Sequence, residues 1–344
     1  MTALDADFGE TLKRLAAGEA LTAAEAAKAF TAIMAGAVSP VRVAAFLTAI
    51  AVRGPTVDEI TGGARTLRLQ ALAVEAPEGA MDVCGTGGDG QGTFNISTAA
   101  AFIVAGCGVP VAKHGNRAMS SRTGTADVLE ALGVRIGLSP EGVAHCLKEA
   151  NIGFMFAQTH HPAMKHVAPV RQELGFRTIF NLLGPLANPA RVKRQLLGVY
   201  SAEWVEPIAK ALQALGAVRA WVVSGGDGLD EITTTTTTTV AALENGKIRR
   251  LEIGPEDAGI ERTGSSALKG GDAGENAEAI RALLKGAKGA FRDIAMLNAA
   301  AALIVAEKAG DLREGARLAA ACIDEGGAYD ALEALIAASR EAAP

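Results

Sequence analysis

Aromatic residues, long hydrophobic runs and paired cysteines are all scarce in this 344-residue sequence. Phe, Trp and Tyr make up 4% of the residues, so the sequence lacks the aromatic surface on which single-stranded nucleic acids stack. The longest apolar run, residues 99–112, is interrupted by Gly106, Gly108 and Pro110 and is too short to cross a bilayer. We therefore expect a soluble protein.

The four cysteines, at positions 84, 107, 146 and 322, form neither a CxxC pair nor a metal-binding spacing. They indicate small, reduced, hydrophobic residues of a cytosolic protein. The first residues show no basic segment followed by an apolar stretch, so no signal peptide is expected and a cytoplasmic location is predicted. The formal net charge is −5, which makes nucleic acid a weak candidate ligand.

The first 75 residues have the pattern of four short helices. Asp7 is expected to precede the first helix, and capping boxes begin the second at Thr22 and the fourth at Thr56. Ser39-Pro40 begins the third, because proline is tolerated in the first turn of a helix. Nothing in this segment suggests chemistry, so we expect a helical domain over residues 1–75 that serves packing or association.

From about residue 80 to the end at 344, the pattern changes to alternating strands and helices. This alternation predicts an α/β domain with a mostly parallel central sheet covered by helices. A hairpin is expected within Leu243–Ile253, around Asn245-Gly246, and the chain from Asn276 onward is mainly helical. The predicted parallel strands are Met81–Cys84, Val109–Ala112, Gly153–Phe156, Gln195–Tyr200 and Arg219–Ser224.

A glycine run and a basic segment each follow one of these strands. Residues 85–90 read GTGGDG, and residues 113–122 carry three fixed cations, a histidine and no acid. Glycines let backbone N–H groups converge on phosphate oxygens, and basic side chains supply matching charge. Because ligands collect at the carboxyl ends of parallel strands, we expect these segments, together with residues 224–231, to form one anion site that binds a pyrophosphate.

The glycine run has a simpler interpretation as a tight turn. It matches neither the dinucleotide-binding GxGxxG pattern nor a Walker loop. Asn95, Ser97 and Thr98 at the start of the next helix favour the phosphate interpretation, because hydroxyls and free N–H groups there can bind phosphate or magnesium.

Three further features each have two interpretations. Asp230-Glu231 offers hard oxygen ligands for Mg²⁺, although alone it is more typical of a solvated turn. The histidines of residues 160–166 lack the spacing of a zinc site, which favours a structural or substrate-lining role. Arg171 could bind a carboxylate through its planar guanidinium or lie on the surface. Because no nucleophile motif is found, we expect that the protein forms no covalent bond to its substrate.

The combination of motifs resembles the anthranilate phosphoribosyltransferase family. The similarity runs in order along essentially the whole chain, and the combination is specific although GTGGD alone would not be. The matching segments are GTGGD (85–89), NIST (95–98), KHGNRAMSS (113–121), GTADVLEALG (124–133), HHPAMKHVAPVRQELGFRTIFNLLGPLANP (160–189) and GLDEI (228–232).

The resemblance implies a Mg²⁺-dependent transferase of tryptophan biosynthesis that converts anthranilate and phosphoribosyl diphosphate into phosphoribosyl-anthranilate and pyrophosphate. It also implies a small N-terminal helical domain, joined by helices from about 160–190, beside a larger α/β domain, usually as a homodimer. The alternative is a pyrimidine nucleoside phosphorylase-like enzyme, whose class shares this architecture. That class has a basic loop resembling Lys-x-Ser-Gly-Arg-Gly, whereas this chain has Lys113-His-Gly-Asn116.

The resemblance also assigns site residues. Lys113, Asp230 and Glu231 would be catalytic, and magnesium would be bound by Ser97, Asp230 and Glu231. Anthranilate would contact Gly85, His114, Asn116, Arg171 and Gly184. Phosphoribosyl diphosphate would be bound by Gly85, Gly88, Asp89, Thr93, Asn95, Ile96, Ser97, Thr98, Lys113, Ser121 and Thr125.

One segment departs from the family pattern. After Glu231 the chain runs through seven threonines, residues 233–239, where the family has a more mixed sequence that often contains Gly-Pro. The proposed metal ligands are retained, so the departure concerns the conformation of the loop.

Overall fold

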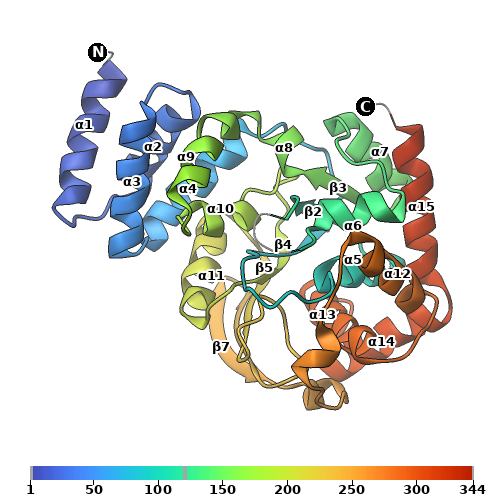
Figure 1. Cartoon of the computed structure of the whole chain (residues 1–344). Helices are drawn as coiled ribbons and strands as arrows, with labels where there is room; N and C mark the ends of the chain where they lie inside the picture. Colours follow the sequence, from blue (N-terminus) through green and yellow to red (C-terminus); the bar gives the residue numbers. More distant parts are fainter. Residues whose placement is uncertain (1–2, 119–121, 343–344) are drawn as a thin grey trace.

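The computed structural model describes residues 3–118 and 122–342, arranged as a helical region beside an α/β region (Figure 1). In Figure 1, the N-terminal helices and α9 group at one end of the molecule, away from the C-terminal helices. The helical region contains α1 (Ala3–Ala16), α2 (Ala23–Met34), α3 (Pro40–Arg53) and α4 (Val57–Gln70), with η1 (Pro162–His166), α9 (Ala168–Leu174) and α10 (Phe180–Leu186) packed against them.

Local sequence signals account for most helix boundaries in this region. Both predicted capping boxes are present, at Thr22 with Glu25 and at Thr56 with Glu59. Helix α3 has proline in its first turn after Ser39, as expected. The expectation for Asp7 is wrong, because α1 already includes this position. An acidic residue is also favourable within the first turns of a helix, so the residue type alone did not mark the boundary.

A seven-stranded sheet forms the centre of the α/β region. Its order is β3-β2-β1-β4-β5-β6-β7, and the first five of these strands run parallel while β6 and β7 are antiparallel additions at one edge. The mostly parallel sheet is therefore confirmed. The strands are β1 (Met81–Gly85), β2 (Val111–Gly115), β3 (Ile152–Phe156), β4 (Arg194–Gly198), β5 (Arg219–Gly225), β6 (Thr238–Glu244) and β7 (Lys247–Ile253).

The predicted hairpin forms but is longer than expected. Asn245 and Gly246 both have positive φ, as a two-residue hairpin turn requires. Strand β6, the first of the hairpin, begins at Thr238 inside the threonine run, because Thr238 and Thr239 pair with Ile253 and Glu252. β-Branched residues favour extended backbone, which explains why these threonines continue the sheet.

The two faces of the sheet belong to two hydrophobic cores. Alternate strand residues, such as Val83 and Trp221, pack in a core with the C-terminal helices, whereas Leu197 and Val222 pack in the core of the helical region. Alternation is expected, because successive strand side chains point to opposite faces. The remaining helices are α5 (Ile96–Gly106), α6 (Thr125–Leu132), α7 (Pro140–Ala150), α8 (Ala157–His160), α11 (Val205–Ala214), α12 (Ala273–Leu284), α13 (Ala290–Val305), α14 (Leu312–Asp324) and α15 (Gly327–Glu341).

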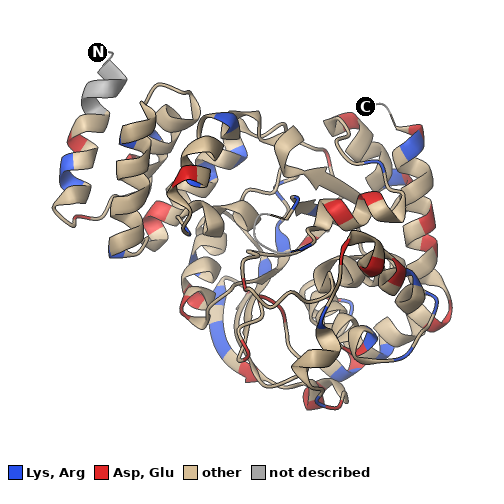
Figure 2. Ribbon diagram, viewed as in Figure 1, with Lys and Arg blue, Asp and Glu red and all other residues tan. Residues whose placement is uncertain are grey.

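Charge and hydropathy agree with this arrangement. Figure 2 shows Lys and Arg interleaved with Asp and Glu over both regions. Among the described residues, none of the helices has the length and apolar character needed to span a bilayer.

Candidate active site

A cleft of about 340 Å³ opens at the carboxyl ends of the parallel strands. The three predicted segments, after β1, after β2 and after β5, all contribute residues to it, and α9 and α10 of the helical region form another wall. Predicted residues that line the cleft are Gly85, Gly88, Asp89, Thr93, Asn95, Ile96, Ser97, Lys113, His114, Asn116, Thr125, Arg171, Gly184, Asp230 and Glu231.

Two predicted residues are not among the lining residues. The Thr98 side chain is buried in α5, and its hydroxyl has no hydrogen-bond partner among the described residues. Ser121 lies outside the described residues. The phosphate-binding part of the prediction therefore falls mainly on the glycine loop and on the first turn of α5.

The glycine loop, residues 85–92, packs against Asp230. A Cβ atom at Gly85 would overlap the Asp230 carboxylate, and one at Gly198 would overlap the Asp230 backbone. The Asp230 Oδ2 atom accepts a hydrogen bond of 2.6 Å from the Gly87 backbone N–H. The absence of side chains at these two strand ends is what lets the β5–β6 loop approach the glycine loop.

Glu231 contacts the first turn of α5, the second segment that is expected to bind phosphate. Its Oε1 atom accepts a hydrogen bond of 3.1 Å from the backbone N–H of Ser97. Burial, and after it the nearby carboxylates, raise the pKa of Asp230 to about 7 and that of Glu231 to about 8. The site thus concentrates negative charge that protein groups only partly neutralise.

Lys113 is the cation that faces these carboxylates. Its side chain is 2% exposed, and Nζ donates to the Val83 carbonyl oxygen at 2.5 Å and to Ser97 Oγ at 3.3 Å. The neighbouring Asp82 is fully buried, accepts hydrogen bonds from the His114 backbone and from Asn188, and has a pKa raised by burial. This arrangement fixes β2 beside β1 and leaves Lys113 at the floor of the cleft.

The carboxylates and their surroundings fit a divalent cation that also uses substrate oxygens. Among residues 3–118 and 122–342, no group of three or more His, Cys, Asp or Glu side chains could hold a metal ion without other ligands. Mg²⁺ commonly binds one or two carboxylates and completes its coordination with phosphate oxygens and water. Asp230 and Glu231, whose pKa values are raised by burial and by neighbouring carboxylates, match that requirement.

The opposite wall carries an unpaired cation. Arg171 is half-buried, its guanidinium lies over the Phe180 ring at 5.4 Å, and no acidic partner is found for it among the described residues. Burial lowers its pKa. Gly184 of α10 lines the same wall, and a Cβ atom there would meet nothing within 4 Å. The wall is therefore suited to a flat anion.

His114, His160 and His161 are buried and have lowered pKa values, and no zinc site is found among the described residues. The His114 and His161 rings lie 5.1 Å apart, and His160 Nδ1 is 3.1 Å from the Phe156 carbonyl oxygen. The Nε2 atoms of all three have no partner among the described residues. Burial lowers the pKa of each, to about 4 for His161.

The basic segment supplies fewer free cations than its composition indicates. Arg117 forms ion pairs with Asp127 at 2.9 Å and with Glu130 at 2.6 Å. These acids are ten and thirteen positions later on α6, outside the basic segment itself. Arg117 and Arg122 both line the cleft, but the Arg117 guanidinium is already paired with these acids.

Sequence reasoning missed residues that contact the site from distant positions. Arg177 donates a hydrogen bond to the Gly88 carbonyl oxygen, and its guanidinium lies 4.3 Å from the centre of the Tyr200 ring. Gly198 and Asn188 were also missed. For Gly198, the signal was a glycine within the predicted strand Gln195–Tyr200, whereas the spacing of Arg177 and Asn188 gave no signal.

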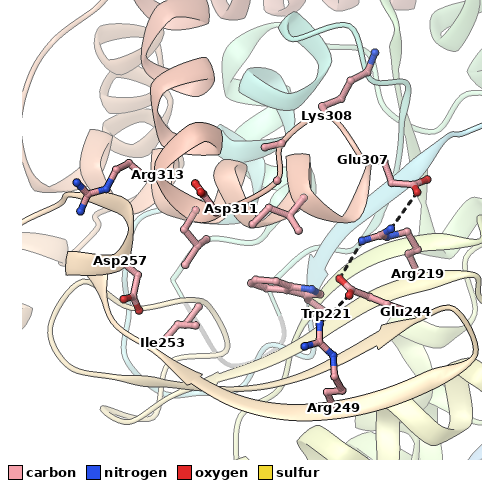
Figure 3. Close-up of a pocket in the computed structure, with 14 residues that line it drawn as sticks. Arg219, Trp221, Glu244, Arg249, Ile253, Asp257, Glu307, Lys308, Asp311 and Arg313 are labelled. Carbon is pink, nitrogen blue, oxygen red and sulfur yellow. Dashed lines mark hydrogen bonds and ion pairs between the residues drawn. The ribbon is translucent and has the colours of Figure 1, made fainter.

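A larger cavity, about 830 Å³, lies between β5–β7 and the α13–α14 connection (Figure 3). Figure 3 shows Trp221 on its floor beside a set of ion pairs. Arg219 binds Glu244 and Glu307 at 3.0 Å each, and Arg249 binds Glu244 at 3.0 Å. The cavity contains none of the predicted site residues and much of its charge is paired internally, so the smaller cleft is the candidate active site.

Comparison with known proteins shows two family models along the chain. Residues 77–329 match "Glycosyl transferase family, a/b domain", and residues 9–71 match "Glycosyl transferase family, helical bundle domain".

Named relatives agree over nearly the full length. The anthranilate phosphoribosyltransferase of Rhodopseudomonas palustris (strain HaA2) is 59% identical over 336 residues, 98% of this chain and 99% of the relative. That of Methylocella silvestris is 59% identical over 331 residues, 96% and 95% of the two chains.

Solved structures of similar proteins agree as well. The Thermus thermophilus anthranilate phosphoribosyltransferase has a TM-score of 0.91 at 46% identity, covering 96% of this chain and 99% of the other. The Saccharomyces cerevisiae enzyme "in complex with PRPP and Mg" has a TM-score of 0.91 at 28% identity, covering 98% of each chain.

The buried histidines predict a loss of stability in acid. His161 has a pKa lowered to about 4, against about 6.5 in an unfolded chain, so the unfolded state binds more protons between these values. This contribution to stability is complete above pH 6.5 and is lost as the pH falls towards 4. Urea unfolding between pH 6.5 and 4.5 should show a shallower pH dependence for His161→Phe than for the wild type. His166→Gln, at an exposed position, is the control; equal slopes for His161→Phe and the wild type would contradict the assignment.

Proposed function

Because the chain belongs to the anthranilate phosphoribosyltransferase family, we propose that it transfers the phosphoribosyl group of phosphoribosyl diphosphate to the amine of anthranilate, with Mg²⁺. The products are N-(5-phosphoribosyl)-anthranilate and pyrophosphate, in the second step of tryptophan biosynthesis from chorismate. The observation that carries the proposal is a single cleft with two separate anion sites, one around Lys113 and the glycine loop and one at Arg171.

Phosphoribosyl diphosphate binds the glycine-loop side of the cleft in this proposal. The loop amides and the first turn of α5 provide N–H groups, and Lys113 provides a fixed positive charge. The S. cerevisiae relative's structure with PRPP supports this class of substrate. The binding residues are Gly85, Gly88, Asp89, Thr93, Asn95, Ile96, Ser97, Thr98, Lys113, Ser121 and Thr125.

Anthranilate binds the opposite wall. Its carboxylate pairs with Arg171, and its ring occupies the open space beside Gly184, with Gly85, His114 and Asn116 around it. The relative "in complex with 4-fluoroanthranilate" supports a substrate of this shape. A half-buried guanidinium that has no acidic partner among the described residues is a strong reason for placing the carboxylate there, because binding would compensate its charge.

Ser97, Asp230 and Glu231 would hold the magnesium ion, and the relative "in complex with PRPP and Mg" supports its use. When bound, Mg²⁺ would neutralise developing charge on the pyrophosphate leaving group. Gly87 and Ser97, through their backbone N–H groups, keep both carboxylates turned toward the cleft. Each carboxylate remains an acceptor with further lone pairs available.

The protein mainly aligns reactants in this reaction. The arylamine of anthranilate is neutral at pH 7 and already nucleophilic, so a strong general base is not required. The anomeric carbon passes through an oxocarbenium-like state. Lys113 and the N–H groups of the glycine loop stabilise the departing charge, while the two walls hold amine and sugar together and exclude water.

Two organisational features are also proposed. The helical domain comprises residues 1–75, joined by helices from about 160–190, and the α/β domain comprises residues 80–344.

The chain forms a homodimer through its helical domain. The outer side of α3 supports this association, because Val41 and Val52 are 80% and 84% exposed, and a spacing of eleven residues places them on one helix face.

Substrate recognition gives the most direct test. Arg171→Ala should raise the KM for anthranilate by roughly ten- to a hundredfold, because losing a charged partner costs about 1.5–3 kcal/mol. The KM for phosphoribosyl diphosphate should change little, and Lys113→Ala should show the reverse pattern. Steady-state kinetics followed by anthranilate fluorescence measures both; the wild type should not convert a pyrimidine nucleoside with phosphate. A loss confined to phosphoribosyl diphosphate in Arg171→Ala would refute the assignment of the two walls.

Metal dependence gives a second test. Asp230→Asn and Glu231→Gln should lower turnover strongly at limiting Mg²⁺, with partial rescue at high Mg²⁺, because each removes a ligand charge. The stability of the metal-free protein at pH 8 should not fall, since burial disfavours these charges. A magnesium titration and urea unfolding measure the two effects. Wild-type activity of both variants throughout the titration would show that the pair is only a turn.

The proposed dimer predicts that substitutions on the outer side of α3 lower the mass of the assembly in solution. Val41→Glu together with Val52→Glu should convert a dimer into a species of 35.0 kDa in sedimentation at micromolar concentration, because two charges would be buried at the interface. Val218→Glu is the matched control, since Val218 is also exposed but precedes β5. A wild-type protein that sediments only as the monomer would refute this proposal.

A further inference from the structure

The β5–β6 loop that carries Asp230 and Glu231 is fixed on both sides by the side chain of Asp227. The Asp227 Oδ1 atom accepts a hydrogen bond from the Leu229 backbone N–H at 3.2 Å, just before the carboxylate pair. Its Oδ2 atom accepts from the Thr233 hydroxyl at 2.7 Å and the Thr235 hydroxyl at 2.5 Å, just after the pair. We call Asp227, Thr233 and Thr235 the loop clamp.

The threonine run supplies the donors of this clamp. The hydroxyls of Thr233 and Thr235, two positions apart, both donate to the Oδ2 atom of Asp227. The Thr235 N–H also donates to the Thr233 hydroxyl at 3.0 Å, which holds the two threonines together. The Thr233 N–H donates to the Thr238 hydroxyl at 3.1 Å, which connects the clamp to the start of β6. No side-chain hydrogen bond of Thr236 is found within the described part of the chain.

Asn298 fixes the same loop from the core. It is fully buried on α13, its Oδ1 atom accepts from the Ile232 N–H at 2.9 Å, and its Nδ2 group donates to the Ile232 carbonyl oxygen at 2.8 Å. Both backbone groups of the residue after Glu231 are thereby satisfied by one side chain. The Asp227 carbonyl in turn accepts from Gln91 Nε2 at 3.0 Å, which connects the clamp to the glycine loop.

We propose that the loop clamp, with Asn298, consists of positioning residues that hold Asp230 and Glu231 in the orientation required to bind the metal ion. This inference rests on the proposed function of the carboxylate pair. The clamp residues do not line the cleft, so they act through the loop backbone. A loop without these bonds would have to be ordered when the metal binds, and the cost of ordering would weaken binding.

The experiment measures metal binding rather than activity. Mn²⁺ replaces Mg²⁺ as a paramagnetic probe, and its affinity for the full-length protein is measured by electron paramagnetic resonance in the presence of inorganic pyrophosphate. Thr235→Val deletes one clamp hydroxyl and keeps the side-chain shape, while Thr236→Val makes the same change one position away. Asp227→Asn weakens the whole clamp, and Asp230→Asn removes a ligand.

We expect Thr235→Val to weaken Mn²⁺ binding about tenfold, because a hydrogen bond to a charged group is lost. Asp227→Asn should weaken it at least as much, and Thr236→Val should match the wild type. Amide hydrogen exchange of residues 229–235 in the ligand-free protein should increase in Thr235→Val and stay unchanged in Thr236→Val. If Asp227→Asn fails to fold, the two threonine variants still decide the question.

Two contrary outcomes have different meanings. Wild-type affinity and exchange in Thr235→Val, while Asp230→Asn loses affinity, would overturn the positioning role and leave the proposed metal site intact. Wild-type affinity in Asp230→Asn would overturn the metal site itself, and the positioning role with it.

Discussion

The close approach of the β5–β6 loop to the ends of β1 and β4 is the contact on which the cleft depends. It is possible only because Gly85 and Gly198 carry no side chain, since a Cβ atom at either position would occupy the space of Asp230. The two glycines are register partners on neighbouring parallel strands. Their position at the carboxyl edge places the Asp230 carboxylate against the glycine loop and brings Glu231 to the start of α5.

The same contact creates an electrostatic imbalance that the protein alone does not remove. Asp230 is 9% exposed, with Asp89 and Glu231 nearby and Lys113 below. Burial favours the neutral form of a carboxyl group, and a nearby positive charge favours the ionised form. Across the cleft, Arg171 has the opposite deficit, because it is a cation for which the described residues supply no acidic partner and its pKa is lowered by burial. In the proposed function, one wall therefore binds a divalent cation together with phosphate groups, and the other wall binds a carboxylate.

Local signals predicted the features that short stretches of chain determine. Nearby residues determine the capping boxes at Thr22 and Thr56 and the strand before the glycine run. They also determine the position of Lys113 at the end of a strand, and therefore in the cleft. Features that depend on distant residues could not be predicted from spacing. Asn188 binds Asp82 across 106 positions, and Arg177 binds Gly88 across 89.

Chemical type could also mislead where the partner was unknown. The basic segment was counted as free charge, but Arg117 is paired with acids of α6. The sequence marks the threonine run only as a departure from the family pattern, whereas Thr233 and Thr235 bind Asp227 and Thr238 belongs to β6. In each case the sequence identified the right kind of side chain, and only the fold determined which atoms it meets.

The division of the cleft into a glycine-loop wall and an Arg171 wall has a consequence for inhibitor design. In the proposed function, a molecule that joins an aromatic carboxylate to a diphosphate mimic would engage Arg171 and the glycine loop at once, so the second contact would be intramolecular. Its effective concentration would be set by the linker, with the largest gain when the linker matches the span between the walls. Gly184 leaves room beside the aromatic group for a substituent, where most pocket walls would present a side chain. Affinity could therefore be increased through geometry, without any stronger individual contact.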